Sequence, residues 1–384
     1  MNDKAKNIVV TVTFCIMIFG IFIINLSKTP STISISERRP LKQIPKLNFE
    51  SVFKPTKENP SFMSEFEDYA LDQFWLRDEF RKIKAFSMYN IFGRSDNNGI
   101  YLVNGQVSKY SNKMNETAIK DNVKKLNKLY NDFLKDMNVY YSIIPDKNYF
   151  IAEENGYPHI DYEKFKSLIC DNMNKNMTYI DLFDTLKIDD YYKTDTHWRQ
   201  EKLGEVVEKL ASVMKFEKAN NYEEKVLEGF YGVYYGQSAL PIDSEKMIYL
   251  TNETLENAKV NVYKLNEEAT SDMDLLKKEE TKIYVESDYK NNDPYDIFLG
   301  GPEMLITIEN ENAKTDKELY IFRDSYGSSL SPLLVEGYKK ITIVDLRYIA
   351  TPILKEVVNF EEGSDVLIIN CVDVLGTGGI LKVL

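Results

Sequence analysis

Apolar residues in this chain follow two spacings, and the alternation between these spacings predicts the fold. From Asn115 to Met137 they recur every three or four residues, which predicts an amphipathic helix, and the stretch NVYYSII that follows is typical of a strand. The alternation continues, with predicted helices at Tyr162–Met173, Thr196–Met214 and Pro352–Phe360 and predicted strands at Met177–Ile180, Lys340–Val344 and Asp365–Ile369. This order predicts an α/β fold with a doubly wound, mainly parallel sheet, whose sites lie at the carboxyl ends of the strands.

Three further stretches complete the predicted main domain, residues 61–384. Apolar residues from Phe62 to Ile83 recur at helical spacing, and we expect one amphipathic helix whose aromatic side chains pack into a core. The run Gly99–Val103, followed by Asn-Gly, predicts a β-hairpin. Residues 219–312 contain short β-like runs among charged, Asn-rich loops, which predicts a β-rich insertion on the sheet.

The N-terminal segment has the hydrophobicity of a membrane span. Ile8–Leu26 contains 19 residues and no charge, enough to cross a bilayer core as a helix or to form the apolar part of a signal sequence. No small-residue cleavage pattern follows it, which favours an uncleaved signal-anchor at residues 1–26. Lys4 and Lys6 precede it, so we expect a single-pass protein of the cell membrane with its C-terminal domain outside the cytoplasm. Residues 27–60, rich in proline, are expected to form an extended tether.

Composition excludes several classes of function. The net charge of −12 provides no basic surface for nucleic acid, and no motif indicates a nucleotide cofactor. Two histidines and three cysteines, one of them inside the apolar segment, are too few and too widely spaced to predict a metal site. Only residues 1–26 have membrane-scale hydrophobicity, so a chain without them is expected to be monodisperse in solution.

The strongest candidate for chemistry is Ser325, in the stretch ELYIFRDSYGSSLSPLL. A buried strand, a polar turn at Asp324 and Ser325, and a helix beyond would raise one hydroxyl above the sheet edge. Free N–H groups at the start of that helix would stabilise an oxyanion formed there. The alternative is that Asp324 and Ser325 only cap the helix.

A serine needs a neighbouring base, and the chain offers two histidines. His159 lies in a proline-containing loop, whereas His197 lies in KTDTHWR, two residues after Asp195. In an Asp-x-His pair the carboxylate can hold one ring nitrogen while the other nitrogen faces the nucleophile. The alternative role of Asp195 is to cap the following helix, and the two roles are compatible.

These motifs resemble the DHHW family and the alginate-type polysaccharide O-acetyltransferases, which have a permuted SGNH-hydrolase-like fold. The resemblance rests on TDTHW, the later RDSY, and Ser142–Tyr149 (SIIPDKNY), which is similar to the family's strand followed by P-x-K. Glu67–Lys84 also resembles the helix before the family's first strand. Two residues depart from the pattern: Thr196 replaces a frequent histidine, and Arg323 stands where SGNH enzymes carry glycine.

The resemblance implies a Ser325–His197–Asp195 triad in an O-acetyltransferase and an acyl donor of the MBOAT type in the membrane. From the residues themselves we expect no cofactor and no metal. Gly229–Gln237 (GFYGVYYGQ) combines aromatic rings with glycines and is suited either to stacking on sugar rings or to a glycine-kinked strand with core tyrosines. The side chains expected to contact substrate are Lys147, Trp198, Arg323, Tyr326, Tyr231 and Tyr235. An acetyl-esterase on the same fold, and a non-catalytic polysaccharide-binding protein in which Arg323 blocks the serine, remain alternatives.

Overall fold

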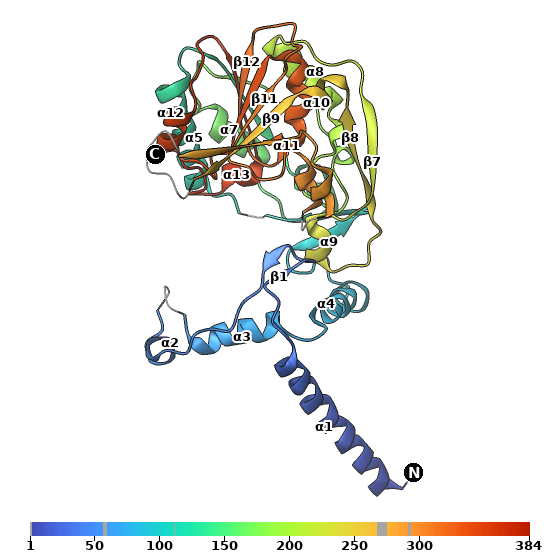
Figure 1. Ribbon diagram of the computed structural model, residues 1–384. Helices are drawn as coiled ribbons and strands as arrows, with labels where there is room; N and C mark the ends of the chain where they lie inside the picture. The colour runs from blue at the N-terminus through green and yellow to red at the C-terminus, as the bar shows by residue number, and fades with distance from the viewer. Residues whose placement is uncertain (1, 57–59, 112, 267–274, 291–292) are drawn as a thin grey trace. The chain divides into compact units, whose positions relative to one another are not determined.

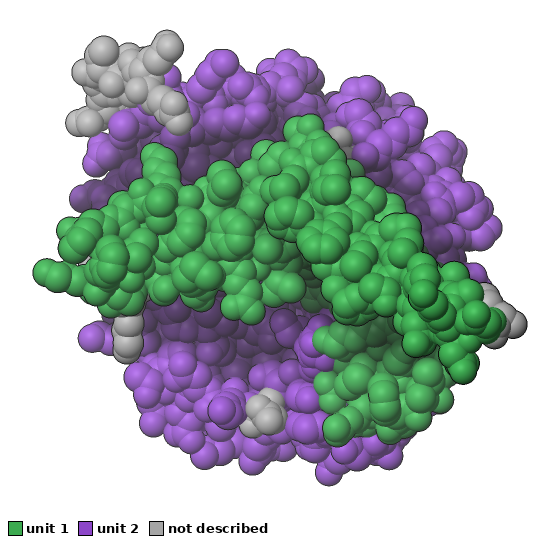
Figure 2. Space-filling view, turned by 90° about the horizontal axis from the view of Figure 1, so that it is seen from below, with its two compact units in different colours: residues 1–97, 235–242 green, residues 98–234, 243–384 purple. Residues whose placement is uncertain are grey.

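The computed structural model describes residues 2–56, 60–111, 113–266, 275–290 and 293–384. The chain forms two compact units: unit 1 contains residues 1–97 and 235–242, and unit 2 contains residues 98–234 and 243–384 (Figure 2). The units therefore divide the chain at residue 97 rather than at the predicted boundary of 61. The two units are described separately below.

Unit 2 is built on an eight-stranded sheet, of which β9, β11 and β12 are labelled in Figure 1. From edge to edge its strands are β10 (Leu276–Thr281), β9 (Lys259–Leu265), β11 (Leu305–Glu309), β13 (Lys340–Val344), β12 (Glu318–Arg323), β14 (Asp365–Cys371), β5 (Asn138–Ile144) and β6 (Thr178–Tyr179). The five strands from β13 to β6 are parallel, while β11, β9 and β10 pair in antiparallel fashion. The prediction of an α/β fold with a mainly parallel sheet is confirmed.

Continuous apolar runs explain why the parallel strands occupy the centre. All seven residues of β14 are buried, as are five of the six residues of β12, because helices cover both faces of such a sheet. Among the covering helices, α5 packs against α7 and α13. The helices of unit 2 are α5 (Glu116–Leu129), α6 (Lys147–Ile151), α7 (Tyr162–Cys170), α8 (Gly204–Met214), α10 (Glu253–Asn257), α11 (Tyr326–Leu330), α12 (Thr351–Val357) and α13 (Val372–Gly376), and α9 (Val233–Ser238) runs from unit 2 into unit 1.

Several predicted elements are confirmed and others are corrected. The Asn-Gly hairpin exists as β3 (Ile100–Val103) and β4 (Gln106–Lys109), with positive φ at both turn residues. The helix expected from Thr196 begins only at Gly204, because the preceding residues form a loop and a short 3₁₀ turn. Residues 219–312 are rich in strands, as expected: β9, β11 and β10 extend the main sheet, and β7 (Glu223–Phe230) pairs with β8 (Glu245–Thr251) apart from it.

Unit 1 begins with α1 (Asp3–Ser27), the one described helix that is long and apolar enough to cross a membrane, with mean hydropathy 2.6. Residues 28–56 contain a small hairpin, β1 (Ile33–Ser34) with β2 (Arg39–Pro40), and a short helix, α2 (Phe49–Phe53), so this part of the predicted tether is not simply extended. The single helix predicted from Phe62 to Ile83 is two helices, α3 (Phe62–Asp72) and α4 (Arg77–Phe86). Leu76, with φ of 56°, breaks the helical pattern between them.

The predicted core packing of this region is also wrong. Phe66, Phe80 and Ile83 are 40%, 49% and 61% exposed, whereas the buried residues of α3 and α4 are Asp72 and Ala85. Helical periodicity located the apolar face but did not show what covers it.

Candidate active site

Ser325 lies where β12 ends, and β12 is paired on both sides by parallel strands, β13 and β14. It precedes the first residue of α11 and is partly exposed, while Asp324 before it and Tyr326 after it are buried. Its Oγ is 2.8 Å from Nε2 of His197. The strand, the turn and the helix therefore place the hydroxyl against a histidine 128 residues away in the chain.

His197 is held on its other side by Asp195. Nδ1 of His197 and Oδ1 of Asp195 are 2.6 Å apart, and the same oxygen accepts the backbone N–H of His197 at 3.0 Å. Oδ2 of Asp195 accepts the backbone N–H of Val233 at 2.8 Å. Because the carboxylate only accepts at these distances, it fixes the proton on Nδ1 and leaves the Nε2 lone pair directed at Ser325.

The Asp195–His197 loop is a narrow hairpin. Tyr191 and Trp198 form an antiparallel bridge, and the N–H of Tyr192 donates to the carbonyl of His197 at 3.1 Å. A single residue, Thr196, separates Asp195 from His197, and the two side chains meet at 2.6 Å. Asp195 does not cap the helix that follows it in the sequence, because that helix begins only at Gly204; its Oδ2 instead accepts the N–H of Val233, the first residue of α9.

A buried lysine collects the carbonyl groups of this loop. Nζ of Lys147 lies 2.6 Å from the Val107 carbonyl, 2.8 Å from that of Tyr192, 2.9 Å from that of Lys193 and 3.3 Å from that of Asp195. Burial lowers the pKa of Lys147 to about 7, while the nearby carboxylates of Glu245 and Asp195 act in the opposite direction. Lys147 thus joins β4 and the Asp195–His197 loop.

The loop is fixed from a second side by residues 232 and 245. The carboxylate of Glu245 accepts the N–H groups of Lys193 and Thr194 at 2.9 and 2.8 Å and the Thr194 hydroxyl at 3.0 Å. Thr194 Oγ1 in turn accepts the N–H of Gly232 at 2.9 Å. A Cβ on Gly232 would lie 2.3 Å from the Thr194 carbonyl oxygen, so only glycine allows this close approach.

Aromatic rings confine the imidazole. Tyr295 stacks on His197 with ring centroids 3.9 Å apart and planes within 7°, and Tyr326 contacts it edge-on at 4.9 Å. The Tyr295 hydroxyl and the Trp198 Nε1–H both donate to Ser329 Oγ, at 2.7 and 2.9 Å. The stacked ring limits rotation of His197 about its side-chain bonds, which keeps Nε2 on Ser325.

Asp324 forms the turn that presents the serine. Its Oδ1 accepts the N–H of Tyr326 at 3.0 Å and its Oδ2 accepts the N–H of Cys371 at 2.6 Å, which ties the end of β12 to the end of β14. The Ser325 side chain makes no cap bond. The expectation of several free N–H groups at this helix start is corrected, since those of Tyr326, Gly327 and Ser328 all have acceptors; among the recorded hydrogen bonds of the described residues, none uses the N–H of Ser325.

The structure places the residues expected to contact substrate in different surroundings. Lys147, Trp198, Arg323 and Tyr326 are all at most 3% exposed, so they support the site from within instead of lining it. Arg323 pairs with Asp345 at 3.3 Å, and Gly327 packs against its aliphatic stem, so Arg323 lies beneath the turn and does not block Ser325. Burial lowers the pKa of the Arg323 guanidinium, and Asp345 opposes that shift.

The glycine and tyrosine segment 229–237 also differs from a simple sugar platform. Phe230 is fully buried, and the backbone N–H groups of Gly232 and Val233 donate to the side chains of Thr194 and Asp195. Tyr231 is 38% exposed in unit 2, whereas Tyr235 belongs to unit 1. Contact of either ring with a sugar stays a prediction.

Sequence reasoning missed Tyr295, Glu245 and Gly232. Each acts through a contact with residues 38 to 98 positions away, and only Gly232, within a segment of unusual composition, carried a local signal. Among the described residues, no group of three or more His, Cys, Asp or Glu side chains is arranged to hold a metal ion. The arrangement is thus that of an activated hydroxyl, suited to nucleophilic attack on an acyl group.

Comparison with known proteins relates the fold to several solved structures. The sequence matches no known family profile and none of the curated proteins compared with it. A DHHW family protein from Eubacterium siraeum is 18% identical with a TM-score of 0.59, over 73% of this chain and 93% of that one. PatB1 of Bacillus cereus is 16% identical with a TM-score of 0.57, over 74% and 100% of the two chains, and a second PatB1 structure carries a sulfonyl adduct. The resemblance to the DHHW family thus extends from short motifs to the fold.

Proposed function

We propose that this protein is a membrane-anchored serine O-acyltransferase that moves acetyl groups to hydroxyls of a cell-surface or secreted polysaccharide. The observation that carries the proposal is the contact of 2.8 Å between Ser325 Oγ and His197 Nε2, continued by that of 2.6 Å between His197 Nδ1 and Asp195 Oδ1. The shared fold with PatB1 and the DHHW family protein supports the same reading.

In the first half-reaction His197 Nε2 takes the hydroxyl proton as Ser325 Oγ attacks the carbonyl carbon of the acyl donor. The tetrahedral intermediate collapses when the imidazolium gives that proton to the leaving atom, and an acyl ester remains on Ser325. Asp195 stabilises the imidazolium and keeps its orientation. The backbone N–H of Ser325 is the candidate oxyanion donor.

In the second half-reaction an acceptor hydroxyl loses its proton to His197 Nε2 and attacks the acyl-serine carbonyl. Collapse returns the proton to Ser325 Oγ and leaves the ester on the acceptor. The partial exposure of Ser325 permits a large acceptor such as a polysaccharide to approach. We propose a membrane acyltransferase of the MBOAT type as donor, with α1 inserted in the same membrane and unit 2 outside the cytoplasm.

The experiment is to label the full chain with a sulfonyl fluoride, which reacts with activated hydroxyls, and to locate the adduct by mass spectrometry. We expect a single adduct on Ser325, and none in Ser325→Ala or His197→Ala. Turnover of nitrophenyl acetate should fall about 10⁴-fold or more in Ser325→Ala, and nearly as far in His197→Ala, because losing either group removes the activated nucleophile. Ser328→Ala, three residues along and 3% exposed, is the matched control and should keep wild-type turnover.

The second measurement separates transfer from hydrolysis. With an acetyl donor and an oligosaccharide acceptor, the transferase forms an acetylated sugar in preference to free acetate, whereas an esterase forms acetate at the same rate with or without acceptor. An adduct on another serine, or wild-type turnover in Ser325→Ala, contradicts the assigned nucleophile. Polysaccharide binding without turnover or adduct would replace the enzyme with a binding protein.

A further inference from the structure

Unit 1 carries an apolar surface outside α1. On α4 and its preceding turn, Leu76, Phe80, Ile83 and Phe86 are each between 41% and 61% exposed, and their three- and four-residue spacing places them on one face. On α3, Met63, Phe66 and Leu71 are exposed as well. Soluble monomers rarely expose large apolar side chains in such numbers on adjoining elements. We call these seven side chains, together with Trp75, the apolar face of unit 1.

Hydrogen bonds fix this face to the end of α1. Oδ1 of Asn25, in the last turn of α1, accepts the backbone N–H of Trp75 at 2.7 Å. Lys28, the next residue after α1, donates to the Gln73 carbonyl at 3.4 Å. The corner between α3 and α4 therefore lies where α1 ends, at the level of the headgroups if α1 crosses the bilayer (Figure 1).

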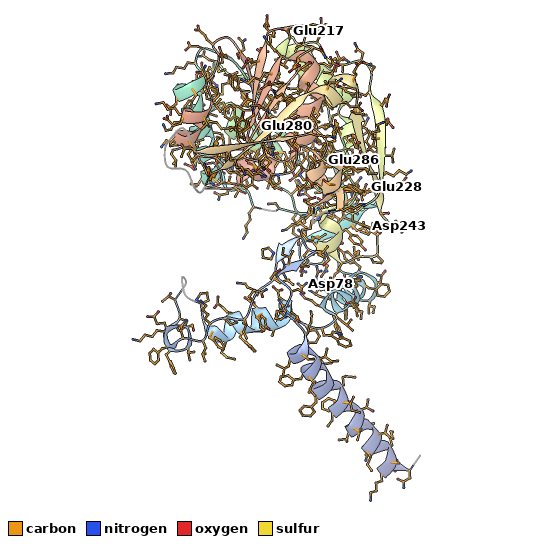
Figure 3. The ribbon with its side chains drawn as sticks, viewed as in Figure 1. Asp78, Glu217, Glu228, Asp243, Glu280 and Glu286 are labelled. Carbon is orange, nitrogen blue, oxygen red and sulfur yellow. The ribbon has the colours of Figure 1, made fainter. Side chains whose placement is uncertain are left out.

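The opposite face of α4 is polar and bound within unit 1. Arg77 and Arg81 pair with Glu37, at 2.6 and 3.1 Å, and Asp78, labelled in Figure 3, accepts the Ser36 hydroxyl at 3.0 Å. These contacts hold the apolar side of α4 outward. The exposure of the apolar side of α4 thus follows from the ion pairs and the hydrogen bond made by its polar side.

The position of the face beside α1 favours a lipid surface over other occupants. Trp75 and the exposed phenylalanines lie next to the end of the only described helix that could cross a membrane. Aromatic side chains beside a membrane span are typical of the interface between the hydrocarbon core and the headgroups.

We propose that unit 1 is a membrane-interface module, in which the apolar face of α3 and α4 lies among the lipid headgroups around the point where α1 leaves the bilayer. Under this proposal α3 and α4 contact the membrane as well, in addition to the residues 1–26 expected from the sequence. The proposal rests on insertion of α1, which is part of the proposed function, but not on the role of Ser325.

The chain provides its own reporter, because its two tryptophans lie in opposite environments. Trp75 is 37% exposed on the proposed face, whereas Trp198 is fully buried in unit 2. The full chain is reconstituted into vesicles of phosphatidylcholine and phosphatidylglycerol, with a fraction of the lipid brominated just below the headgroup. We expect brominated lipid to quench about half of the wild-type emission and almost none in Trp75→Phe, which keeps only Trp198.

A second variant tests the face itself. In Phe80→Gln with Ile83→Gln, α1 still holds the chain on floating vesicles, but quenching of Trp75 should fall at least twofold. If the wild type floats and Trp75 is unquenched by lipid yet open to acrylamide, the face is solvent-exposed and the proposal is wrong. If Trp75 is shielded from both, protein covers the face and the proposal is equally wrong. A chain that does not float with vesicles overturns both this proposal and anchoring by α1, while leaving the adduct on Ser325 unaffected.

Discussion

The two units of this protein differ in how they place their large apolar side chains. Unit 2 encloses apolar residues of its sheet and helices, such as Ile321 at 1% exposure, in one continuous core. Unit 1 turns apolar residues such as Ile83 outward, and its described apolar core consists of Ala85, Ala239 and Leu240 with Tyr89 and Ile242 beside them. Unit 1 is held instead by ion pairs around Asp72 and Glu37. The contrast shows that the same apolar spacing serves a protein interior in one unit and an outer surface in the other.

The largest expected difference concerns stability. Ile321→Ala removes three buried carbon atoms from the middle of β12 and should lower the free energy of unfolding by about 3–4 kcal/mol. Ile83→Ala removes the same atoms from an exposed position and should change it by less than about 0.5 kcal/mol in detergent. Urea unfolding of both variants, followed by circular dichroism, measures the two values. Equal losses would mean that Ile83 packs into a core and that the contrast between the units is false.

The second prediction concerns the backbone that supports the site. Gly232→Ala places a methyl carbon 2.3 Å from the Thr194 carbonyl oxygen and 2.4 Å from Asp195 Cα, so the loop must shift. A displacement near 1 Å at a catalytic group lowers turnover about 100-fold. Gly204→Ala, where nothing lies within 4 Å, is the control and should keep full activity. Turnover of nitrophenyl acetate tests both, and wild-type rates in Gly232→Ala would show that the close approach does not position Asp195.

Gly232 shows the limit of prediction from the sequence at this site. Ser325, His197 and Asp195 were predictable because each lies in a short motif whose local geometry, a strand-turn-helix or an Asp-x-His loop, follows from adjacent residues. Gly232 and Tyr295 were not, because their roles depend on contacts with a loop far away in the chain. Residue types alone do not report such contacts.

The fold shows the same division. The alternation of helices and strands predicted the parallel sheet, since each pattern is local and repeated. The break at Leu76 was not predictable, because leucine at positive φ is disfavoured locally and is imposed by the surrounding structure. The antiparallel strands β9, β10 and β11 lie in the predicted insertion, where short charged strands give a weak pattern. Their position at one edge of the sheet follows from hydrogen bonds between strands, which the sequence pattern does not show.

The smallest expected effect lies in the polar network of unit 1. Asp72 accepts two hydrogen bonds from the Arg39 guanidinium, at 2.9 and 2.6 Å, and one from the N–H of Lys42 at 2.9 Å. The Arg39 hydrogen bonds lower the pKa of Asp72 to about 2, from an ordinary value of 3.8. A carboxyl group whose pKa is lower in the folded state contributes stability above its unfolded pKa and loses it as the pH falls through the folded value. The contribution is therefore complete at pH 5 and lost between about pH 4 and pH 2.

Because the site is partly screened by solvent, we expect Asp72→Asn to loosen the corner between α3 and α4 by only about 1 kcal/mol. Trp75 reports on that corner, because its N–H donates to Asn25 Oδ1 and because Gln73, next to Asp72, accepts a hydrogen bond from Lys28 through its carbonyl. Acrylamide quenching of Trp75, taken as the difference between each protein and its Trp75→Phe version in detergent, should rise in the wild type as the pH falls from 4 to 2. In Asp72→Asn we expect quenching that is already raised at pH 7 and changes little with pH. If this variant instead shows the same pH profile as the wild type, apolar packing and not the ion pairs holds unit 1 together.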